Sequence, residues 1–376
     1  MSFIPLTRPP IDETDVEAVA RVLRSGMLVQ GSEITALERE IGEYLNSSNV
    51  VAVSNGTATL HLALLALGIG PGDDVLVPAF SYVATANVVE IVGARPIFVD
   101  VDPKTFNIDV SQIETAITPR TKAIIAVHEF GLACDIFEIM SIAKSHGLKV
   151  IEDAACALGA SIDDVFVGTI GDVGSFSLHP RKAITSGEGG LITTEDAGLA
   201  ETFRVMRNHG IQSSNGTTRF VKAGLNYRMT NFQGALVRGQ LKRIDQILEG
   251  RDNVANRYFE GLDFIGEDGS LPVIPQGRRH TWQTFHVVLP AEVDRDVVIT
   301  ELRNRDIGSN YGAQCIPVQE YYVNKYALDV DALFPNSMRA YRSGLALPMY
   351  DSMGNVETDR VIEALRLVLA DGSNNA

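Results

Sequence analysis

The chain has 376 residues, of which 45% are hydrophobic and 21% charged, and a formal net charge of −15. This composition is typical of a globular protein long enough for two domains, and the negative charge argues against nucleic acid or an anionic membrane as a partner. No apolar run approaches the ~20 residues of a membrane span, and the first residues lack the features of a signal peptide, so we expect a cytoplasmic protein.

Cysteine and histidine usage gives no sign of a metal site. The three cysteines, Cys134, Cys156 and Cys315, have no metal-ligand spacing and no even pairing, so reduced thiols are the simplest interpretation. The seven histidines are scattered without a pair at ligand spacing. We therefore expect no bound metal.

Short apolar runs alternate with helical patterns, such as the one at residues 135–146, along the first two thirds of the chain. This rhythm predicts an α/β fold. A helical pattern at 231–248 is expected to continue to residue 264 and to contain the domain boundary, with a large domain at 1–250 and a small one at 251–376. The seven expected strands are residues 50–54, 75–77, 96–101, 123–127, 149–151, 173–178 and 191–193.

The first expected strand leads into Asn55-Gly56-Thr57-Ala58, after which an apolar helix runs to Gly68. Backbone N–H groups of this turn and the Thr57 hydroxyl group would lie at a helix N-terminus, which is a ready anion site. An ordinary capping turn of the same composition explains the pattern equally well.

The second expected strand is followed by Phe80-Ser81-Tyr82. An aromatic ring at Tyr82 could stack on a cofactor. An ordinary core or rim aromatic explains it as well.

Asp153 follows the fifth expected strand, and Lys182 follows the sixth, just before Gly187-Glu188-Gly189-Gly190. Open α/β folds bind ligands at the carboxyl ends of their strands. Pyridoxal phosphate (PLP) requires such a pair, because a lysine forms the imine with its aldehyde and an aspartate keeps its ring nitrogen protonated. Taken singly, a surface lysine and a helix N-cap aspartate are common. Ser177 could add a hydroxyl group to the anion site.

Several motifs in order resemble the sugar aminotransferases of the DegT/DnrJ/EryC1/StrS family, from about residue 4 to about residue 369. The resemblance implies a fold-type I PLP-dependent transferase with a mostly parallel seven-stranded sheet flanked by helices, a smaller C-terminal α/β domain, and a homodimer with shared active sites. The motifs are Ser54-Asn-Gly-Thr57-Ala, Leu67-Gly-Ile-Gly-Pro-Gly-Asp73, Val77-Pro78 with Tyr82-Val-Ala-Thr-Ala86, Glu152-Asp-Ala-Ala155, Ser177-Leu-His179 with Lys182, Gly187-Glu-Gly-Gly190 and Asn226-Tyr-Arg-Met229.

The resemblance also implies roles for single residues. Lys182 corresponds to the imine lysine, Asp153 to the partner of the ring nitrogen and Tyr82 to the stacking aromatic. Asn226 corresponds to a contact with the phosphate of the other subunit, although without the family it would be a turn or cap asparagine. The implied phosphate contacts are Gly56, Thr57 and Ser177, with Ala58 lining the same turn.

Departures from the family concern the substrate more than the chemistry. Cys156 stands where the family usually has glutamine or histidine beside the cofactor's ring hydroxyl group, and the family's histidine is absent from residues 314–319. Arg181 is larger and more basic than expected; it could hold an anionic substrate or simply face solvent. The expected substrate-binding residues are His179, Arg181, Arg228 and Gln314.

The expected activity is transfer of an amino group from L-glutamate to a keto-sugar for surface polysaccharide or glycoconjugate synthesis. A nucleotide-linked 4-keto or 3-keto deoxysugar is the first choice, and a free carboxylate-bearing keto-sugar, such as an oxidised 3-deoxy-octulosonate, is the second. Sugar dehydratases and PLP-binding regulators among the relatives are alternatives. Lys182 argues against the dehydratases, in which histidine replaces it. A nicotinamide site is not expected, because the first turn lacks Gly-x-Gly-x-x-Gly.

Overall fold

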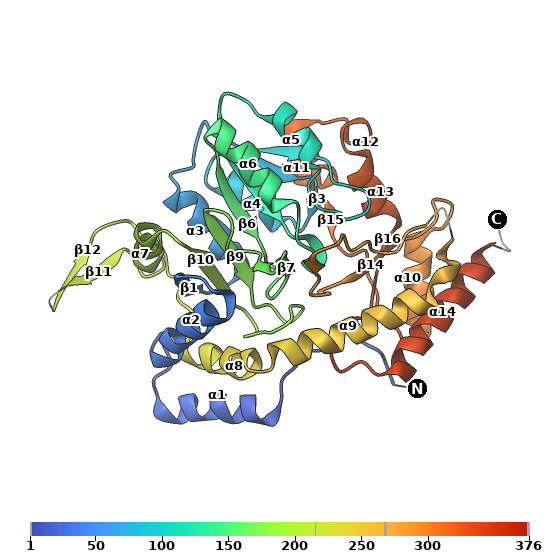
Figure 1. Ribbon diagram of the computed structural model, residues 1–376, viewed down its shortest axis with the longest axis horizontal. Coiled ribbons are helices and arrows are strands. Elements are labelled where there is room, and N and C mark those ends of the chain that lie inside the picture. The colour runs from blue at the N-terminus through green and yellow to red at the C-terminus, as the bar shows by residue number, and fades with distance from the viewer. Residues whose placement is uncertain (1, 215, 267–268, 374–376) are drawn as a thin grey trace.

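A seven-stranded sheet with helices on both faces forms the centre of the computed structural model, which describes residues 2–214, 216–266 and 269–373 (Figure 1). All seven expected strands lie in it, and their order is β1-β10-β9-β6-β5-β2-β4. Only β10 runs antiparallel to its neighbours, so the expectation of a mostly parallel sheet is confirmed. The strands are β1 (Asn49–Val53), β2 (Asp74–Pro78), β4 (Arg95–Val99), β5 (Thr121–Val127), β6 (Lys149–Asp153), β9 (Val173–Ser177) and β10 (Gly190–Thr194).

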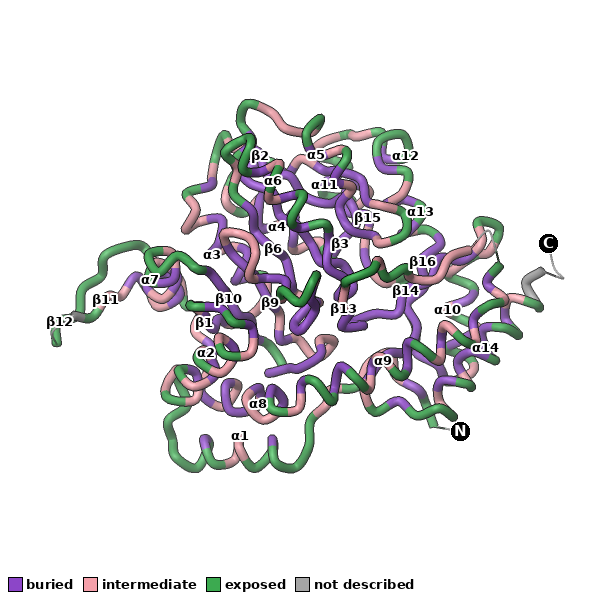
Figure 2. Tube along the Cα trace, viewed as in Figure 1, coloured by how far each residue is buried: buried purple, intermediate pink, exposed green. Residues whose placement is uncertain are grey.

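Successive residues of these strands enter apolar clusters on opposite faces of the sheet, because side chains alternate along a strand. Val75 and Val77 of β2 pack in the cluster beneath α3, whereas Leu76 packs in the one beneath α6. Both faces are therefore covered, which explains why the strands read as continuous apolar runs. Figure 2 shows these strands as buried. The covering helices include α2 (Ser32–Leu45), α3 (Gly56–Ala66), α4 (Ala84–Ile91), α5 (Val110–Ala116), α6 (Ile136–His146) and α7 (Ala197–Met206).

The continuous helix expected from residue 231 to residue 264 is wrong. The structure has two helices, α8 (Asn231–Leu241) and α9 (Ile244–Gly261), and Arg243 between them has a non-helical backbone. The Arg243 guanidinium group binds Asp15 Oδ2 at 2.8 Å and the Pro10 carbonyl group at 3.1 Å. This tertiary pairing with the N-terminal segment coincides with the break.

The second half of α9 packs with the C-terminal part of the chain. There β14 (Phe285–Val288) and β16 (Gly344–Leu347) form an antiparallel pair, packed with α10 (Arg295–Asn304) and α14 (Asn355–Ser373) around their own apolar cluster. Ile4 also lies in this cluster and bridges to Ile307. The division at residue 250 stays a prediction.

Residues 314–343 return from the C-terminal part to the large sheet. β15 (Gln314–Cys315) pairs with β3 (Phe80–Ser81), next to the end of β2. The following helices α11 (Glu320–Tyr326), α12 (Val330–Leu333) and α13 (Pro335–Ser343) place Tyr322, Phe334 and Met338 in the apolar cluster over β2. Residues 314–343 therefore cover the sheet next to the carboxyl end of β2.

The remaining elements lie at the periphery. Strands β11 and β12 form a hairpin that projects from the body at the left of Figure 1. No helix among the described residues is long and apolar enough to cross a membrane. These elements are α1 (Glu13–Ser25), β7 (Ser161–Ile162), β8 (Val165–Phe166), β11 (Ile211–Ser214), β12 (Thr217–Phe220), β13 (Arg278–Arg279) and the 3₁₀ turns η1 (Glu129–Gly131), η2 (Asp263–Ile265) and η3 (Ile316–Val318).

Candidate active site

Lys182 lies in a tight turn that follows the carboxyl end of β9. Its Nζ atom donates a hydrogen bond to Cys156 Sγ at 3.1 Å. The turn is closed by a bond of 2.9 Å from the Lys182 N–H to the His179 carbonyl group. It is held from behind by Gln240 of α8, whose amide group bonds both the N–H and the carbonyl group of Thr185. The amine is therefore presented by a rigid turn, within reach of Cys156, which lies three residues beyond β6.

Asp153 is the last residue of β6 and is only 5% exposed. Thr85 of α4 donates its hydroxyl proton to Oδ2 at 2.9 Å, and the Ala155 N–H donates to Oδ1 at 3.2 Å. Burial raises the pKa of this carboxyl group, while the two hydrogen bonds and the Lys182 charge oppose the rise. A carboxylate held this way is suited to bind a cationic or N–H group of a ligand.

Glu152, one position earlier, points to the opposite face and serves the fold. Its carboxylate accepts backbone N–H groups of Gly168, Ile170 and Gly171, and His128 Nε2 lies 3.0 Å from it. The Cys134 N–H donates to His128 Nδ1, so the ring carries its proton at Nε2 and donates it to Glu152. Burial opposes ionisation of Glu152, but these donors hold its pKa below the usual value.

The predicted anion turn forms the first turn of α3, and the structure brings it against Ser177 at the end of β9. A Cβ atom added to Gly56 would lie 2.9 Å from Ser177 Cβ, so only glycine lets the turn approach this closely. The Ala58 N–H is taken by the Asn55 side chain, at 2.8 Å. The N–H groups of Gly56 and Thr57, which have no helical partner by geometry, remain for an anion.

Tyr82 and Gln314 lie on the other side of the sheet edge. Tyr82 directly follows β3 and is 65% exposed, so its ring is open to a ligand or to another chain. Gln314 pairs with Ser81 across the β15–β3 bridge, and its Oε1 atom is buried without a hydrogen-bond partner among the described residues. Gln314 is thus brought beside the predicted stacking residue.

His179 and Arg181 share the Lys182 turn. The Arg181 N–H donates to His179 Nδ1 at 3.2 Å, and burial lowers the pKa of His179. Within the described parts of the chain, Arg181 forms no ion pair. A partly buried cation with no acidic partner is free to hold an anion.

Asn226 and Arg228 lie by the end of β1, and among the described residues neither is hydrogen-bonded to Lys182 or to the other residues of its turn. Tyr227 between them accepts the Ser54 N–H at 2.9 Å, and Arg228 donates to Asn208 Oδ1 at 2.7 Å. Asn226 is exposed. Among the described residues, no hydrogen bond links its side chain to Ser177 or Lys182.

Two side chains at this edge, Thr85 and Glu129, were absent from the sequence prediction. Thr85 orients the Asp153 carboxylate, and Glu129 is a second buried carboxyl group whose pKa depends on the charges of Asp153 and Lys182. A signal for Glu129 did exist, since it follows the expected strand 123–127 much as Asp153 follows another. Thr85 lies within the motif Tyr82-Val-Ala-Thr-Ala86, but nothing in that motif indicated that its hydroxyl group reaches Asp153.

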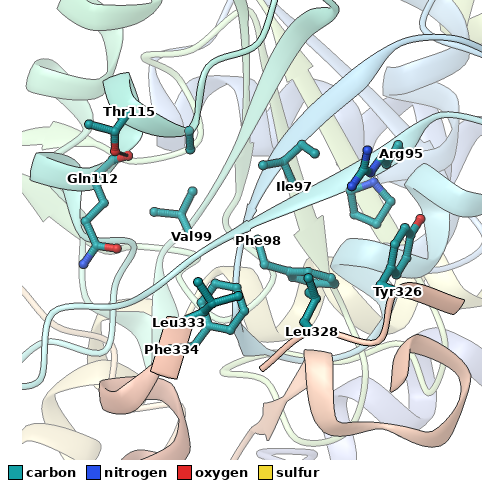
Figure 3. A pocket seen from close by; sticks show the side chains of 12 residues that line it. Arg95, Ile97, Phe98, Val99, Gln112, Thr115, Tyr326, Leu328, Leu333 and Phe334 are labelled. Atoms are coloured by element: carbon teal, nitrogen blue, oxygen red, sulfur yellow. Dashed lines mark hydrogen bonds between the residues drawn. The ribbon is translucent and has the colours of Figure 1, made fainter. Parts of the chain in front are cut away.

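A separate cavity of about 310 Å³ lies along the edge strand β4 (Figure 3). Phe98, Tyr326 and Phe334 give it largely apolar walls, and Arg95 stands at one end. Lys182, Asp153, Cys156 and Tyr82 do not line this cavity. The chemistry of the sheet edge therefore does not extend to this cavity.

Comparison with known proteins decides among the ligands that such an edge could hold. The sequence profile of the DegT/DnrJ/EryC1/StrS aminotransferase family matches residues 9–366. The chain belongs to this family. Its relatives include the spore coat polysaccharide biosynthesis protein SpsC of Bacillus subtilis, 37% identical over 97% of this chain and 96% of the relative. The GDP-perosamine synthase of Caulobacter vibrioides is 39% identical over 90% and 91%.

The DegT/DnrJ/EryC1/StrS aminotransferase family also accounts for the fold and the cofactor. A Streptococcus pneumoniae protein solved in its PLP form superimposes with a TM-score of 0.92 at 28% identity, covering 98% of this chain and 99% of the other. Like its family, this chain is a PLP-dependent sugar aminotransferase. The site fits PLP, because three groups meet at one sheet edge. These are the Lys182 amine, the buried Asp153 carboxylate, and the N-terminus of α3, where Gly56 packs closely against Ser177.

Proposed function

We propose that the chain moves an amino group from L-glutamate to a nucleotide-linked keto-deoxysugar used in surface polysaccharide synthesis. The observation that carries the proposal is the position of the Lys182 amine, 3.1 Å from Cys156 Sγ. Lys182 follows β9, and Asp153 ends the neighbouring strand β6. The names of the two relatives, a polysaccharide biosynthesis protein and a GDP-sugar synthase, support the sugar class.

In this proposal PLP, when bound, withdraws electrons from the substrate carbon so that its proton can leave. Lys182 would hold the cofactor through its amine and would serve as the general base for that proton. Asp153 would supply the negative charge that keeps a proton on the ring nitrogen. Gly56, Thr57 and Ser177 would bind the phosphate, and Tyr82 would lie against the ring.

The position beside Cys156 differs from the family pattern. A thiol is a weak hydrogen-bond donor, and burial raises the pKa of Cys156, while the Lys182 charge opposes this. The thiol therefore stays protonated at neutral pH. We infer that Cys156 lies by the ring hydroxyl group and holds it less firmly than an amide would.

We infer that the active enzyme is a homodimer in which Asn226 reaches the phosphate of the other subunit. Three observations support this: Asn226 is exposed and unattached to its own site, Tyr82 is exposed, and the projecting β11–β12 hairpin carries exposed Phe220 and Val221. Apolar side chains on a projecting hairpin are typical of a surface covered by another chain.

A free, carboxylate-bearing keto-sugar is the second candidate acceptor. Arg181 favours it, because this cation adjoins Lys182 and forms no ion pair with any described residue. Arginine matches the geometry of a carboxylate through paired N–H groups. It also binds phosphate, so Arg181 alone does not choose between the two sugars.

A single-turnover experiment tests the proposal. The enzyme is loaded with PLP, converted to its amino form with glutamate, and freed of 2-oxoglutarate. A panel of nucleotide-linked keto-sugars and free keto-sugar acids is then added, and return of the original visible absorbance is followed. Recovery with a nucleotide-linked sugar supports the first candidate and recovery with an acid the second. Failure of glutamate to convert the enzyme would reject the proposed donor.

A further inference from the structure

Residues 280–284 connect the C-terminal part of the chain with the loops that carry Cys156 and Lys182, and the proposed mechanism assigns them no task. They lead directly into β14 and are all buried, with Thr281 1% exposed and Gln283 9% exposed. A buried segment outside helices and strands has to satisfy its polar groups through tertiary contacts. These contacts show which parts of the active site the segment holds.

Trp282 anchors this segment on α9. Its indole N–H donates to Asp252 Oδ1 at 2.8 Å, and its carbonyl group accepts from Arg251 at 2.8 Å. Trp282 has φ 48°, a left-handed conformation that is unfavourable for a residue with a side chain. Such a backbone persists only where its surroundings hold it, so Thr281 and Gln283 on either side are fixed in place.

Thr281 holds the loop that carries Cys156. Its hydroxyl group donates to the Cys156 carbonyl oxygen at 2.8 Å, and its N–H donates to the Gly131 carbonyl group at 3.1 Å. A Cβ atom added to Gly131, whose φ is 100°, would collide with Thr281 Oγ1 and lie 3.0 Å from the Cys156 carbonyl oxygen. Glycine is therefore needed for this close approach. No backbone N–H of the described residues reaches the Cys156 carbonyl group, so this loop depends on the Thr281 hydroxyl group.

Gln283 holds the turn that carries Lys182. Its Nε2 atom donates to the Arg181 carbonyl group at 3.3 Å, and the Thr284 hydroxyl group donates to its Oε1 atom at 3.0 Å, which orients the amide group. Arg251, which also binds the same segment, donates to the Lys182 carbonyl group at 3.3 Å. The turn is thus held through two successive carbonyl groups.

The segment therefore bonds the backbone of both residues that meet in the active site. Lys182 Nζ lies 3.1 Å from Cys156 Sγ, although one residue follows β9 and the other follows β6. Two loops from different strands do not set such a distance by themselves. A hydrogen bond weakens steeply as its geometry departs from the ideal, so a segment tied to both loops controls this contact.

We propose that Thr281 and Gln283 are further positioning residues of this active site, which fix the contact between Lys182 Nζ and Cys156 Sγ by holding the backbone on each side of it. The inference rests on the proposed function, because the roles of Lys182 and Cys156 beside the cofactor belong to it. It does not depend on which sugar or amino donor is used.

Alkylation of Cys156 by iodoacetamide, in the full-length enzyme without cofactor, measures this contact. Cys134 and Cys315 are fully buried, and peptide mass spectrometry assigns the adduct to Cys156. The thiolate is the form that reacts, so the dependence of the alkylation rate on pH gives the pKa of the thiol group.

Burial raises the pKa of Cys156, and the Lys182 charge lowers it. The Glu129 and Asp153 charges act in the raising direction. Lys182 is hydrogen-bonded to the thiol group, so a widened contact should weaken its lowering effect first. In Thr281→Val we therefore expect the midpoint of the rate profile to move up, with several-fold slower alkylation at neutral pH. Thr281→Ser, which restores the hydroxyl group, should keep the native midpoint.

Two further variants make the test specific. Gln283→Met removes the side-chain donor to the Arg181 carbonyl group and should move the midpoint in the same direction. Thr194→Val is the matched control. Thr194 is 5% exposed, and its hydroxyl group donates to the Asp172 carbonyl group at 2.8 Å, beside the start of β9. Its loss should lower stability by a comparable amount and leave the midpoint unchanged.

Repeating the measurement in a Lys182→Ala background shows whether the effect passes through Lys182. Neither Thr281→Val nor Gln283→Met should move the midpoint there, because the contact has already been removed. An upward shift that requires Lys182 supports the proposal. A native midpoint in both single variants, or the same shift with and without Lys182, overturns it. Gln283→Met probes the contact from the other side, so the test survives if Thr281→Val does not fold.

The reaction gives a second readout. In the loaded enzyme, the rate of the glutamate half-reaction per bound PLP should fall in Thr281→Val, recover in Thr281→Ser and stay native in Thr194→Val. A purely structural Thr281 would reduce the amount of loaded enzyme without changing the rate per loaded site, and that result would reject the proposal. Alkylation needs neither cofactor nor substrate, so a failure of glutamate would reject the proposed donor and leave the alkylation result decisive.

Discussion

At the scale of single residues, the proposed mechanism assigns the imine to the Lys182 amine, and this assignment has a simple test. Borohydride treatment of the PLP-loaded enzyme should fix the cofactor permanently on Lys182, because reduction makes a lysine–cofactor bond irreversible. Peptide mass spectrometry should find the added mass on the peptide that contains Lys182, and Lys182→Ala should remain unlabelled. A label on another lysine would contradict the assignment.

Thr85 offers a second test at this scale. Thr85→Val keeps the shape of the side chain but removes the donor to Asp153 Oδ2. A buried acceptor left without its donor costs about 1–3 kcal/mol, so the free energy of unfolding in urea should fall by that amount. The half-reaction with glutamate should slow as well. Thr115→Val, at an exposed position of α5, is the control and should change neither quantity.

The sequence predicted that Lys182 and Asp153 follow neighbouring strands of the sheet, but it did not predict the groups around them. Both follow apolar runs, and parallel strands bring their carboxyl ends together. Glu129 follows a strand in the same way, but its burial depends on the left-handed turn at Phe130, which no sequence pattern indicates. The hydrogen bond from Thr85 to Asp153 depends on how α4 packs against the sheet, and the local sequence does not indicate this packing.

At the scale of elements, α9 ties the two parts of the chain to the Lys182 turn. Arg251 in this helix is fully buried, and it donates to the carbonyl groups of Trp282 at 2.8 Å and Lys182 at 3.3 Å. Burial lowers its pKa to about 10, while the charge of Asp351 opposes the fall. The helix therefore holds the Lys182 turn through a cation that remains charged at neutral pH.

Arg251→Met should destabilise the protein, because two buried carbonyl groups lose a donor at about 1–3 kcal/mol each. We expect a loss of about 2–5 kcal/mol in urea unfolding, together with weaker PLP retention. Arg257→Met on the same helix breaks an exposed pair with Asp359, which solvent screens, and should cost far less stability than Arg251→Met. Equal losses in the two variants would show that Arg251 has no special role.

The elements themselves were largely predictable, with instructive exceptions. All seven strands of the sheet were expected, because buried strands read as apolar runs. The antiparallel direction of β10 could not be inferred, since an apolar run carries no direction. The break between α8 and α9 was missed because the apolar pattern continues through it, whereas the ion pairs of Arg243 with the N-terminal segment lie far away in sequence.

At the scale of the whole molecule, two buried histidines should set its sensitivity to acid. Burial lowers the pKa of His280 and His286 to about 3, below the ordinary 6.5 that each regains on unfolding. The unfolded chain therefore binds these protons first. Their stabilising contribution is complete above pH 6.5 and is lost as the pH falls toward 3, on the order of 1 kcal/mol per pH unit for each histidine.

Urea unfolding between pH 7 and pH 5 measures this slope. The double variant His280→Asn, His286→Leu should have a flatter dependence, whereas His146→Gln, at an exposed site, should keep the original slope. An unchanged slope in the double variant would mean that other groups govern the acid response.

The proposed shared site makes a prediction about mixed dimers. Lys182→Ala removes the amine, and Asn226→Asp adds a carboxylate that repels phosphate. If Asn226 acts on the other subunit, a mixed dimer of the two variants has one doubly damaged and one intact site, and activity should reappear on mixing. Mixed dimers isolated through two different tags that regain no activity would place Asn226 in its own subunit's site.

The return of residues 314–338 to the large sheet has a consequence for how the protein is made. A ribosome completes all seven strands of the sheet long before it adds Ile316, Tyr322 and Phe334, which fill the cluster over β2. Until then the nascent chain carries an open apolar surface, and β3 lacks its strand partner Gln314. Translation that stops before residue 314 should therefore release an aggregation-prone product, and completion of this face of the sheet should await the last sixth of the chain.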